Sequence, residues 1–108
     1  MKPWLFLLIA IIFEVCGTTS MKLSSGFTKI LPSVLIFLFY AVSFVSLTFC
    51  LKQMDVSTAY AVWSGLGTFL IAVIGIIHFK ESFSLIKMIS LMFIIVGVVG
   101  VNLSNGHE

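Results

Sequence analysis

The chain has 108 residues, of which 60% are hydrophobic and 9% are charged, and its formal net charge is +2. A soluble domain has about 25% charged residues, so this composition indicates a membrane protein and excludes an ordinary soluble domain. The small net charge gives no reason to expect a nucleic-acid partner. There is no arginine, and all six lysines lie at or near the ends of apolar segments, where a bilayer keeps them.

Four apolar stretches have the roughly 17–25 residues that a helix needs to cross a bilayer. They cover about residues 4–21, 32–51, 58–79 and 85–103, and short polar breaks join them. Short connections make neighbouring helices antiparallel and leave no room for a soluble domain. We therefore predict an all-α membrane protein with a single transmembrane domain over residues 1–108. Four short helices enclose little polar space, so we expect a dimer of eight helices.

The first segment carries one carboxylate in its apolar middle, Glu14, and the nearest charges, Lys2 and Lys22, lie at its two ends. An acid at the centre of a spanning helix costs roughly 2.5–3.5 kcal/mol on insertion scales, which makes it a functional residue by default, with proton or cation handling first. The alternative is a structural acid that is buried and permanently protonated. Helical spacing places on the same face Leu7, Ala10, Gly17, Thr18 and Met21.

Aromatic residues in the second and third segments suggest a site for organic cations. Tyr60 and Trp63 share one face of the third segment, and Tyr40 and Ser43 lie in the second. Ring faces attract organic cations by about 2 kcal/mol or more when the pair is desolvated. The alternative is ordinary packing or an interfacial belt, which is where membrane aromatics commonly lie.

Small residues mark two further features. Gly65 and Gly67 in the third segment allow either close helix packing or a local hinge, and a transporter needs an element with two states to alternate access. Ser90, Gly97 and Gly100 form a small-residue face in the fourth segment. Such faces mark helix contacts in lipid, and we assign this one to dimerisation.

The sequence carries no pattern typical of an enzyme or a metal site. Cys16 and Cys50 lie inside apolar segments without a C-x-x-C motif or a nearby histidine, so we expect small buried hydrophobes rather than a disulfide or zinc ligands. No nucleophile–base pair or phosphate loop is recognisable. We expect no enzymatic activity and no cofactor, with protons as the coupling ion.

The lysines give only a weak orientation signal. If all four segments span, Lys2 and Lys52 lie on one side of the membrane. The other side carries Lys22, Lys29, Lys80 and Lys87. Because so small a bias permits insertion in both directions, an antiparallel homodimer becomes a reasonable hypothesis.

Four short motifs complete the sequence pattern: FEVCGTTSMK at 13–22, SGFT at 25–28, PS at 32–33 and AYAVWSGLG at 59–67. With the lone acid and four spans they extend over nearly the whole chain, and the last motif is highly specific. The chain resembles the small multidrug resistance transporters, and within them the quaternary-ammonium exporters. The resemblance implies an antiparallel, dual-topology homodimer in the bacterial plasma (inner) membrane that exchanges protons for lipophilic cations.

The resemblance also implies roles for individual residues. Glu14 would be the shared proton and substrate site, and the segment from Gly65 to Gly67 would be a flexible kink. Trp4 stands where the family commonly has a tyrosine, which preserves an aromatic ring. The other residues expected in or beside the substrate cavity are Ala10, Gly17, Thr18, Tyr40, Ser43, Tyr60 and Trp63.

The short sequence after the acid bears on the subtype. The guanidinium-exporting subtype typically has a tryptophan where this chain has Gly17, so the resemblance favours the multidrug subtype. Ser90 stands where the family usually has glycine in the fourth segment, so the strength of dimer packing there stays open. Asp55 stands where a proline is common before the third segment, so the shape of that loop stays open. The alternatives are a guanidinium exporter, one half of a heterodimeric pair, or a structural membrane subunit in which Glu14 merely holds helices together.

Overall fold

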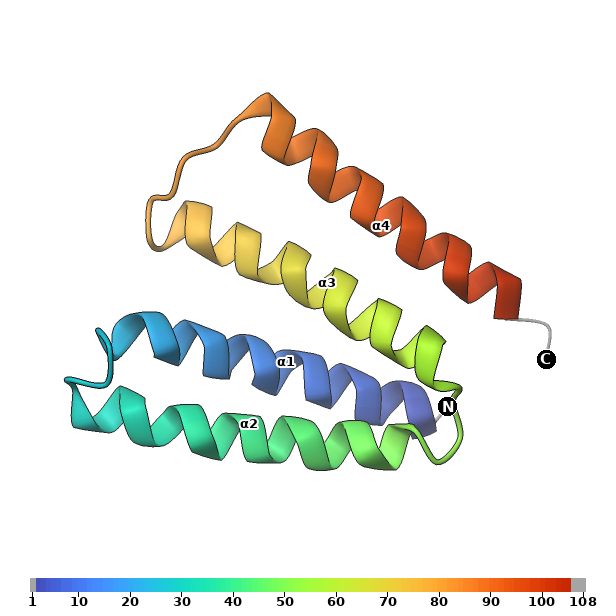
Figure 1. Ribbon diagram of the computed structural model, residues 1–108, viewed down its shortest axis with the longest axis horizontal. Coiled ribbons are helices and arrows are strands. Elements are labelled where there is room, and N and C mark those ends of the chain that lie inside the picture. The colour runs from blue at the N-terminus through green and yellow to red at the C-terminus, as the bar shows by residue number, and fades with distance from the viewer. Residues whose placement is uncertain (1, 106–108) are drawn as a thin grey trace. The chain divides into compact units, whose positions relative to one another are not determined.

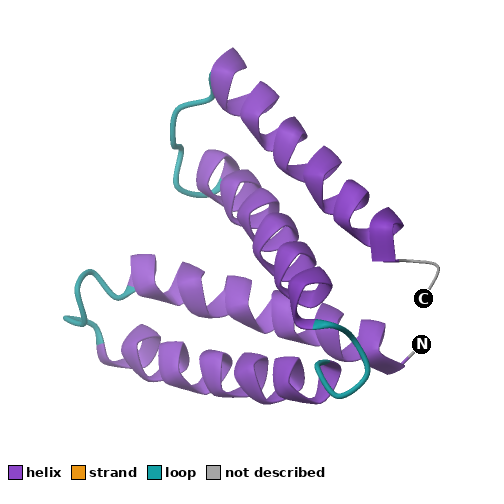
Figure 2. Cartoon of the chain, turned by 45° about the vertical axis from the view of Figure 1, so that its right-hand side comes forward, coloured by secondary structure: helices purple, strands orange, loops and turns teal. Residues whose placement is uncertain are grey.

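The computed structural model describes residues 2–105, which form four helices (Figure 1). These are α1 (Lys2–Leu23), α2 (Ile30–Cys50), α3 (Val56–Ile77) and α4 (Leu85–Asn105). Figure 2 shows helices joined by short loops, with no strand among the described residues. Each helix is long and apolar enough to cross a membrane, so the all-α prediction with four spans is confirmed.

The helix ends differ from the predicted ends by up to two residues. α2 begins at Ile30 rather than at Pro32. Proline is tolerated there because its missing N–H falls among the first four amides of a helix, which have no intrahelical partner. α3 ends at Ile77 rather than at residue 79, because Lys80 takes a left-handed conformation (φ 57°) and the Glu81 amide turns back to donate to the Gly75 carbonyl at 2.9 Å.

The chain divides into two compact units, Met1–Asp55 and Val56–Glu108, and each contains one antiparallel pair of helices. In the first unit, α1 and α2 lie side by side along their length (Figures 1 and 2). The buried residues along this pair are Leu7, Ala10, Ile11, Val15, Gly17 and Ser20 from α1 with Ile36, Ser43, Ser46 and Cys50 from α2.

A buried hydrogen bond joins the middle of α1 to the middle of α2. The hydroxyl of Ser43 donates to the backbone carbonyl of Ala10 at 2.7 Å, and both residues are fully buried. Aromatic rings meet on either side of this bond: Phe6 with Phe49 at 5.6 Å, and Phe13 with Phe39 at 5.9 Å. Since lipid supplies no hydrophobic force between helices, close packing and interhelical hydrogen bonds must hold the pair together.

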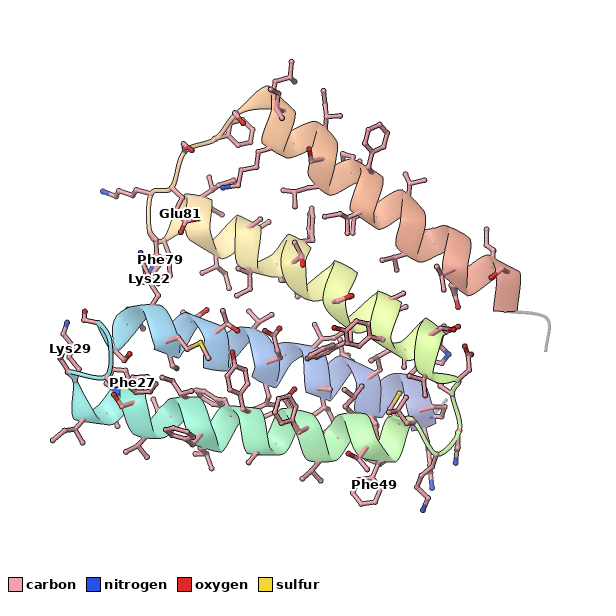
Figure 3. The ribbon with its side chains drawn as sticks, viewed as in Figure 1. Lys22, Phe27, Lys29, Phe49, Phe79 and Glu81 are labelled. Atoms are coloured by element: carbon pink, nitrogen blue, oxygen red, sulfur yellow. The ribbon has the colours of Figure 1, made fainter. Side chains whose placement is uncertain are left out.

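The turn between α1 and α2 is fixed by the buried Ser24. Its hydroxyl donates to the Met21 carbonyl at 2.8 Å and accepts the Phe27 amide at 3.2 Å. Gly26 has φ 70°, a left-handed conformation that glycine adopts without strain. Lys22 and Lys29 lie at this end of the pair, and Phe49 lies near the opposite end (Figure 3).

In the second unit, Gly65 marks a close approach between α3 and α4. A side chain added at Gly65 would run into Val98 and would lie 3.3 Å from Ile94. After the end of α3, Glu81 returns over Gly75 and forms a long ion pair with Lys87 at 3.9 Å. Both partners are partly exposed, so this pair contributes little to stability.

We predict that Ser43→Ala destabilises the α1–α2 pair by about 1 kcal/mol, because the substitution removes a buried hydrogen bond between the helices. Ser33→Ala is the matched control, since the Ser33 hydroxyl bonds locally at the start of α2, to the carbonyl of the cap residue Lys29 at 2.6 Å. Reversible unfolding in mixed micelles measures both. Equal losses of unfolding free energy in the two variants would show that the interhelical hydrogen bond contributes no more than a local one.

Candidate functional site

Glu14 lies in the middle of α1, half-buried, with a hydroxyl one turn further along the helix. The Thr18 hydroxyl donates to Oε2 of Glu14 at 2.7 Å. The same oxygen of Thr18 lies 2.7 Å from the hydroxyl of Tyr40, which comes from α2. Three side chains from two helices therefore form one hydrogen-bonded chain that ends on the carboxylate.

Gly17 makes this geometry possible. A Cβ atom at position 17 would lie 2.9 Å from Cε1 and 3.0 Å from Cδ1 of Tyr40, closer than carbon atoms ordinarily approach. The tyrosine ring thus rests directly against the backbone of α1, which brings its hydroxyl within reach of Thr18. The predicted placement of Gly17, Thr18 and Tyr40 beside Glu14 agrees with these contacts, while their contact with a substrate stays a prediction.

Tyr40 has two further neighbours. Its ring stacks on Phe44, with centroids 5.7 Å apart and planes 3° from parallel. Its hydroxyl lies 3.6 Å from the sulfur of Met21, within the range of a weak hydrogen bond to a thioether. Met21 shares a helix face with Glu14, but nothing in the sequence gave its sulfur a role, because the meeting with Tyr40 depends on how α1 and α2 align.

The remaining expected cavity residues of this unit lie apart from the hydrogen-bonded chain. Ala10 and Ser43 are 0% exposed and contact each other between the helices, so the structure gives them a packing role. Trp4 lies in the first turns of α1 and is 43% exposed. Whether any of the three contacts substrate stays a prediction.

Two aromatic residues of α3 form a pair. The rings of Tyr60 and Trp63 are 5.5 Å apart with planes inclined by 51°, and Tyr60 is 59% exposed. The indole nitrogen of Trp63 is buried and has no hydrogen-bond partner among residues 2–105. Because burying an unpaired donor costs about 1–3 kcal/mol, this nitrogen is a place where an acceptor from outside the described chain would be stabilising. Both residues belong to the second unit, so their joining with Glu14 in one cavity stays a prediction.

The predicted hinge and dimer residues have different surroundings. Gly65 and Gly67 are buried within α3, whose helix runs unbroken through both. The contact of Gly65 with Val98 favours the packing alternative at that position, and the hinge stays a prediction. On α4, Ser90 is exposed, and a Cβ added at Gly97 would meet nothing within 4 Å. This face of α4 is therefore open to a partner.

A cavity of about 320 Å³ between α3 and α4 is a poor candidate for the cation site. Its lining is apolar except for Lys87, whose ammonium group repels a cation. It contains none of the expected site residues. The lining residues are Phe69, Val73, Ile76, Ile77, Phe83, Lys87, Met88, Leu91 and Met92.

No group of three or more histidine, cysteine or acidic side chains that could hold a metal occurs in the described part of the chain. Cys50 is fully buried, with its sulfur 3.4 Å from that of Met54, and Cys16 is half-buried. Glu14 stands apart from such a group, and its hydrogen-bond partner among the described residues is the Thr18 hydroxyl. This is an arrangement suited to a proton or an organic cation rather than to a divalent metal.

Comparison with known proteins gives the family of the chain. The family model for the Small Multidrug Resistance protein matches residues 2–94. The uncharacterized membrane protein YvaE of Bacillus subtilis is 58% identical over 93% of this chain and 84% of its own length. The multidrug resistance protein EbrB of Bacillus subtilis is 43% identical over 99% of this chain and 92% of its own. The quaternary ammonium compound-resistance protein QacE of Escherichia coli is 42% identical over 95% and 94%.

The matched region covers α1, α2, α3 and the first half of α4, and therefore every expected cavity residue. These relatives align along most of their length, so the likeness is to whole chains rather than to a shared fragment. The protein is a multi-pass membrane protein, and it belongs to the small multidrug resistance family of transporters.

Proposed function

We propose that this protein is a proton-coupled antiporter that exports lipophilic, aromatic or quaternary ammonium cations across the bacterial plasma membrane by alternating access. The observation that carries the proposal is the position of Glu14: a half-buried carboxylate in the middle of a spanning helix, bonded to the Thr18 hydroxyl and, among the described residues, to no basic group. Such a carboxylate is stabilised in lipid by taking up either a proton or a cationic ligand.

The Glu14 carboxylate keeps hydrogen-bonding capacity for that ligand. An ionised carboxylate can accept about four hydrogen bonds. Thr18 is its one hydrogen-bond donor among the described residues. The remaining capacity of the two oxygens is available to a cation or to a proton, and the two ligands exclude each other because they neutralise the same charge. Competition at one carboxylate couples proton entry to cation exit without any bond to substrate.

The aromatic pair of α3 suits the cation. Tyr60 and Trp63 present adjacent rings, and ring faces attract organic cations with little dependence on the cation's exact shape. The names of EbrB and QacE, which refer to multidrug and quaternary ammonium resistance, support the same substrate class. Trp63 would then recognise the cation while Glu14 neutralises it.

The contact between Gly17 and Tyr40 favours the multidrug subtype over the guanidinium subtype. Even a methyl group at position 17 would press on the tyrosine ring, so the tryptophan typical of the guanidinium subtype requires a different position of Tyr40. With glycine there, the ring packs on the α1 backbone, and no bulky side chain from position 17 occupies the space beside Glu14.

The proposed assembly is an antiparallel homodimer. A carboxylate in lipid needs shelter on more sides than one helix pair gives, and a Cβ added at Gly97 or Gly100 on α4 would meet no atom of residues 2–105 within 4 Å. Small residues let the helices of two chains approach closely. The weak lysine bias, two on one side against four on the other, permits the two chains to insert in opposite directions.

The first test of the function is Glu14→Gln. We expect this variant to fold but to lose proton-driven uptake of tetraphenylphosphonium in proteoliposomes and the pH dependence of its binding, because an amide cannot exchange a proton for a cation. Glu81→Gln is the matched control, since Glu81 lies in the turn after α3 beside Lys87; this variant should keep both activities. Coupled uptake that survives Glu14→Gln would overturn the proposal.

A second prediction tests the subtype argument. Gly17→Ala should displace the Tyr40 ring and weaken tetraphenylphosphonium binding by about fivefold, since overpacking costs on the order of 1 kcal/mol or more. The ring displacement is measured as a shift of the ¹³C resonances of labelled Tyr40. Ser33→Ala is the control, because its hydroxyl bonds to the Lys29 carbonyl at the start of α2, away from Tyr40. Unchanged Tyr40 resonances in Gly17→Ala would contradict the packing argument.

The third prediction concerns orientation. In a Cys16→Ala, Cys50→Ala background, a single cysteine is placed at the exposed position of Ser25 in the first turn or of Gln53 in the second. If chains insert both ways, an impermeant thiol reagent should label each cysteine partially in intact cells and fully after permeabilisation. Complete labelling at one position and none at the other would instead support a fixed orientation.

A further inference from the structure

The hydrogen-bonded chain at Glu14 contains one contact that its ionised form cannot use. The Tyr40 hydroxyl lies within hydrogen-bond range of two acceptors, Oγ1 of Thr18 at 2.7 Å and the sulfur of Met21 at 3.6 Å, but it carries a single hydrogen. While Glu14 is ionised, Thr18 must give its own hydrogen to the carboxylate. Tyr40 must then donate to Thr18, and the sulfur of Met21 receives nothing.

Protonation of Glu14 on Oε2 reverses the direction of each of these hydrogen bonds. The new carboxyl O–H becomes the donor and Thr18 the acceptor. Thr18 then turns its hydrogen to Tyr40, and Tyr40 turns its hydrogen to Met21. No covalent bond forms or breaks apart from the O–H bond at Glu14, and the two hydroxyl hydrogens only rotate. The two 2.7 Å contacts, Glu14–Thr18 and Thr18–Tyr40, allow hydrogen bonds in either direction. In the protonated state the Met21 sulfur is the acceptor for the Tyr40 hydrogen.

We infer that the chain Glu14–Thr18–Tyr40–Met21 is a protonation-dependent relay whose hydrogen-bond direction reverses when Glu14 takes up a proton, with the thioether of Met21 as the terminal acceptor. The inference rests on the proposed function in that Glu14 exchanges protons. It assigns Met21 a positioning role: its sulfur receives the displaced Tyr40 hydrogen, so it stabilises the protonated state and leaves the ionised state unaffected.

Tyr40 is the titratable group of α2 that faces Glu14 through Thr18, and no ion pair joins the carboxylate to a basic group within residues 2–55. Among the described residues, the other titratable groups of α1, α2 and their turn are Lys2, Cys16, Lys22, Lys29 and Cys50. The lysines are exposed at the ends of the helix pair, and Cys50 contacts Met54. None of them has a hydrogen bond or an ion pair with Glu14, so the reversal follows Glu14 alone.

The direct test is the Raman doublet of tyrosine, which distinguishes a hydroxyl that only donates from one that also accepts. In a Tyr60→Phe background Tyr40 is the single tyrosine. Between alkaline and acidic pH the doublet should change from the pattern of a strong donor to that of a donor and acceptor. The same spectra in Glu14→Gln should show no pH dependence. A doublet that does not change with pH while Glu14 titrates would overturn the relay.

A second measurement isolates Met21. Met21→Leu should reduce the pH-dependent change of the doublet. It should also tighten tetraphenylphosphonium binding at acidic pH by about two- to threefold, because the competing protonated state loses a weak hydrogen bond. At alkaline pH the dissociation constant should not change. Met54→Leu, which removes another thioether of the same unit, should affect neither measurement. Equal effects of Met21→Leu at both pH values would contradict the relay.

The outcomes separate the relay from the transport function. If the doublet reverses with pH but proteoliposomes show no proton-driven uptake, the relay stands and the antiport proposal fails. If uptake is proton-driven and the doublet does not change, antiport stands and the relay fails. The spectra of the Tyr60→Phe background carrying native Met21 decide the question even if Met21→Leu does not fold.

Discussion

The α1–α2 pair is organised around one carboxylate, Glu14, which needs hydrogen-bond donors from the protein. Glu14 lies where lipid supplies no water, and an ionised acid there is stable only if side chains of the protein solvate it. Thr18 supplies one donor from the next turn of the same helix, and Tyr40 orients that donor from the facing helix. Two hydroxyls stabilise the charge without neutralising it, whereas a lysine or arginine in their place would compete with the cation that the site is proposed to bind.

The packing of the pair follows from this demand. Tyr40 can reach Thr18 only because position 17 has no side chain, so glycine is required there for contact between helices rather than for backbone freedom. Two turns before Gly17 on α1, the Ala10 carbonyl accepts the hydrogen bond from Ser43 that fixes the alignment of the helices. That bond contributes stability without adding charge. The site therefore depends on an alignment that small residues and neutral hydrogen bonds set, and a slip of one residue would carry Tyr40 away from Thr18.

The sequence was sufficient to predict the helices, because four apolar runs of spanning length leave few alternatives. It was also sufficient to single out Glu14, since an acid without a basic partner in such a run is conspicuous, and helical spacing placed Thr18 on its face. The Gly17–Tyr40 contact, the Ser43–Ala10 bond and the sulfur of Met21 beside Tyr40 could not be predicted from periodicity. Each depends on the alignment of α1 with α2, and periodicity within one helix does not determine the alignment between two. The predicted end of α3 is two residues too late, because the left-handed conformation occurs at Lys80 and no glycine in the sequence signals it.

The stacking of Tyr40 on Phe44 determines how protonation of Glu14 can affect the Tyr40 hydroxyl on α2. The two rings are nearly parallel, and the Gly17 backbone supports the Tyr40 ring as well, so the ring is held while its hydroxyl hydrogen stays free to rotate. A change at the carboxylate can then reach α2 by rotation of two hydrogens, without movement of a heavy atom. Such a response is fast and costs little, but by itself it moves no helix. The larger rearrangement of the proposed alternating access would therefore use the interactions that the occupied site adds, and under the proposal the cation or proton on Glu14 selects which of them form.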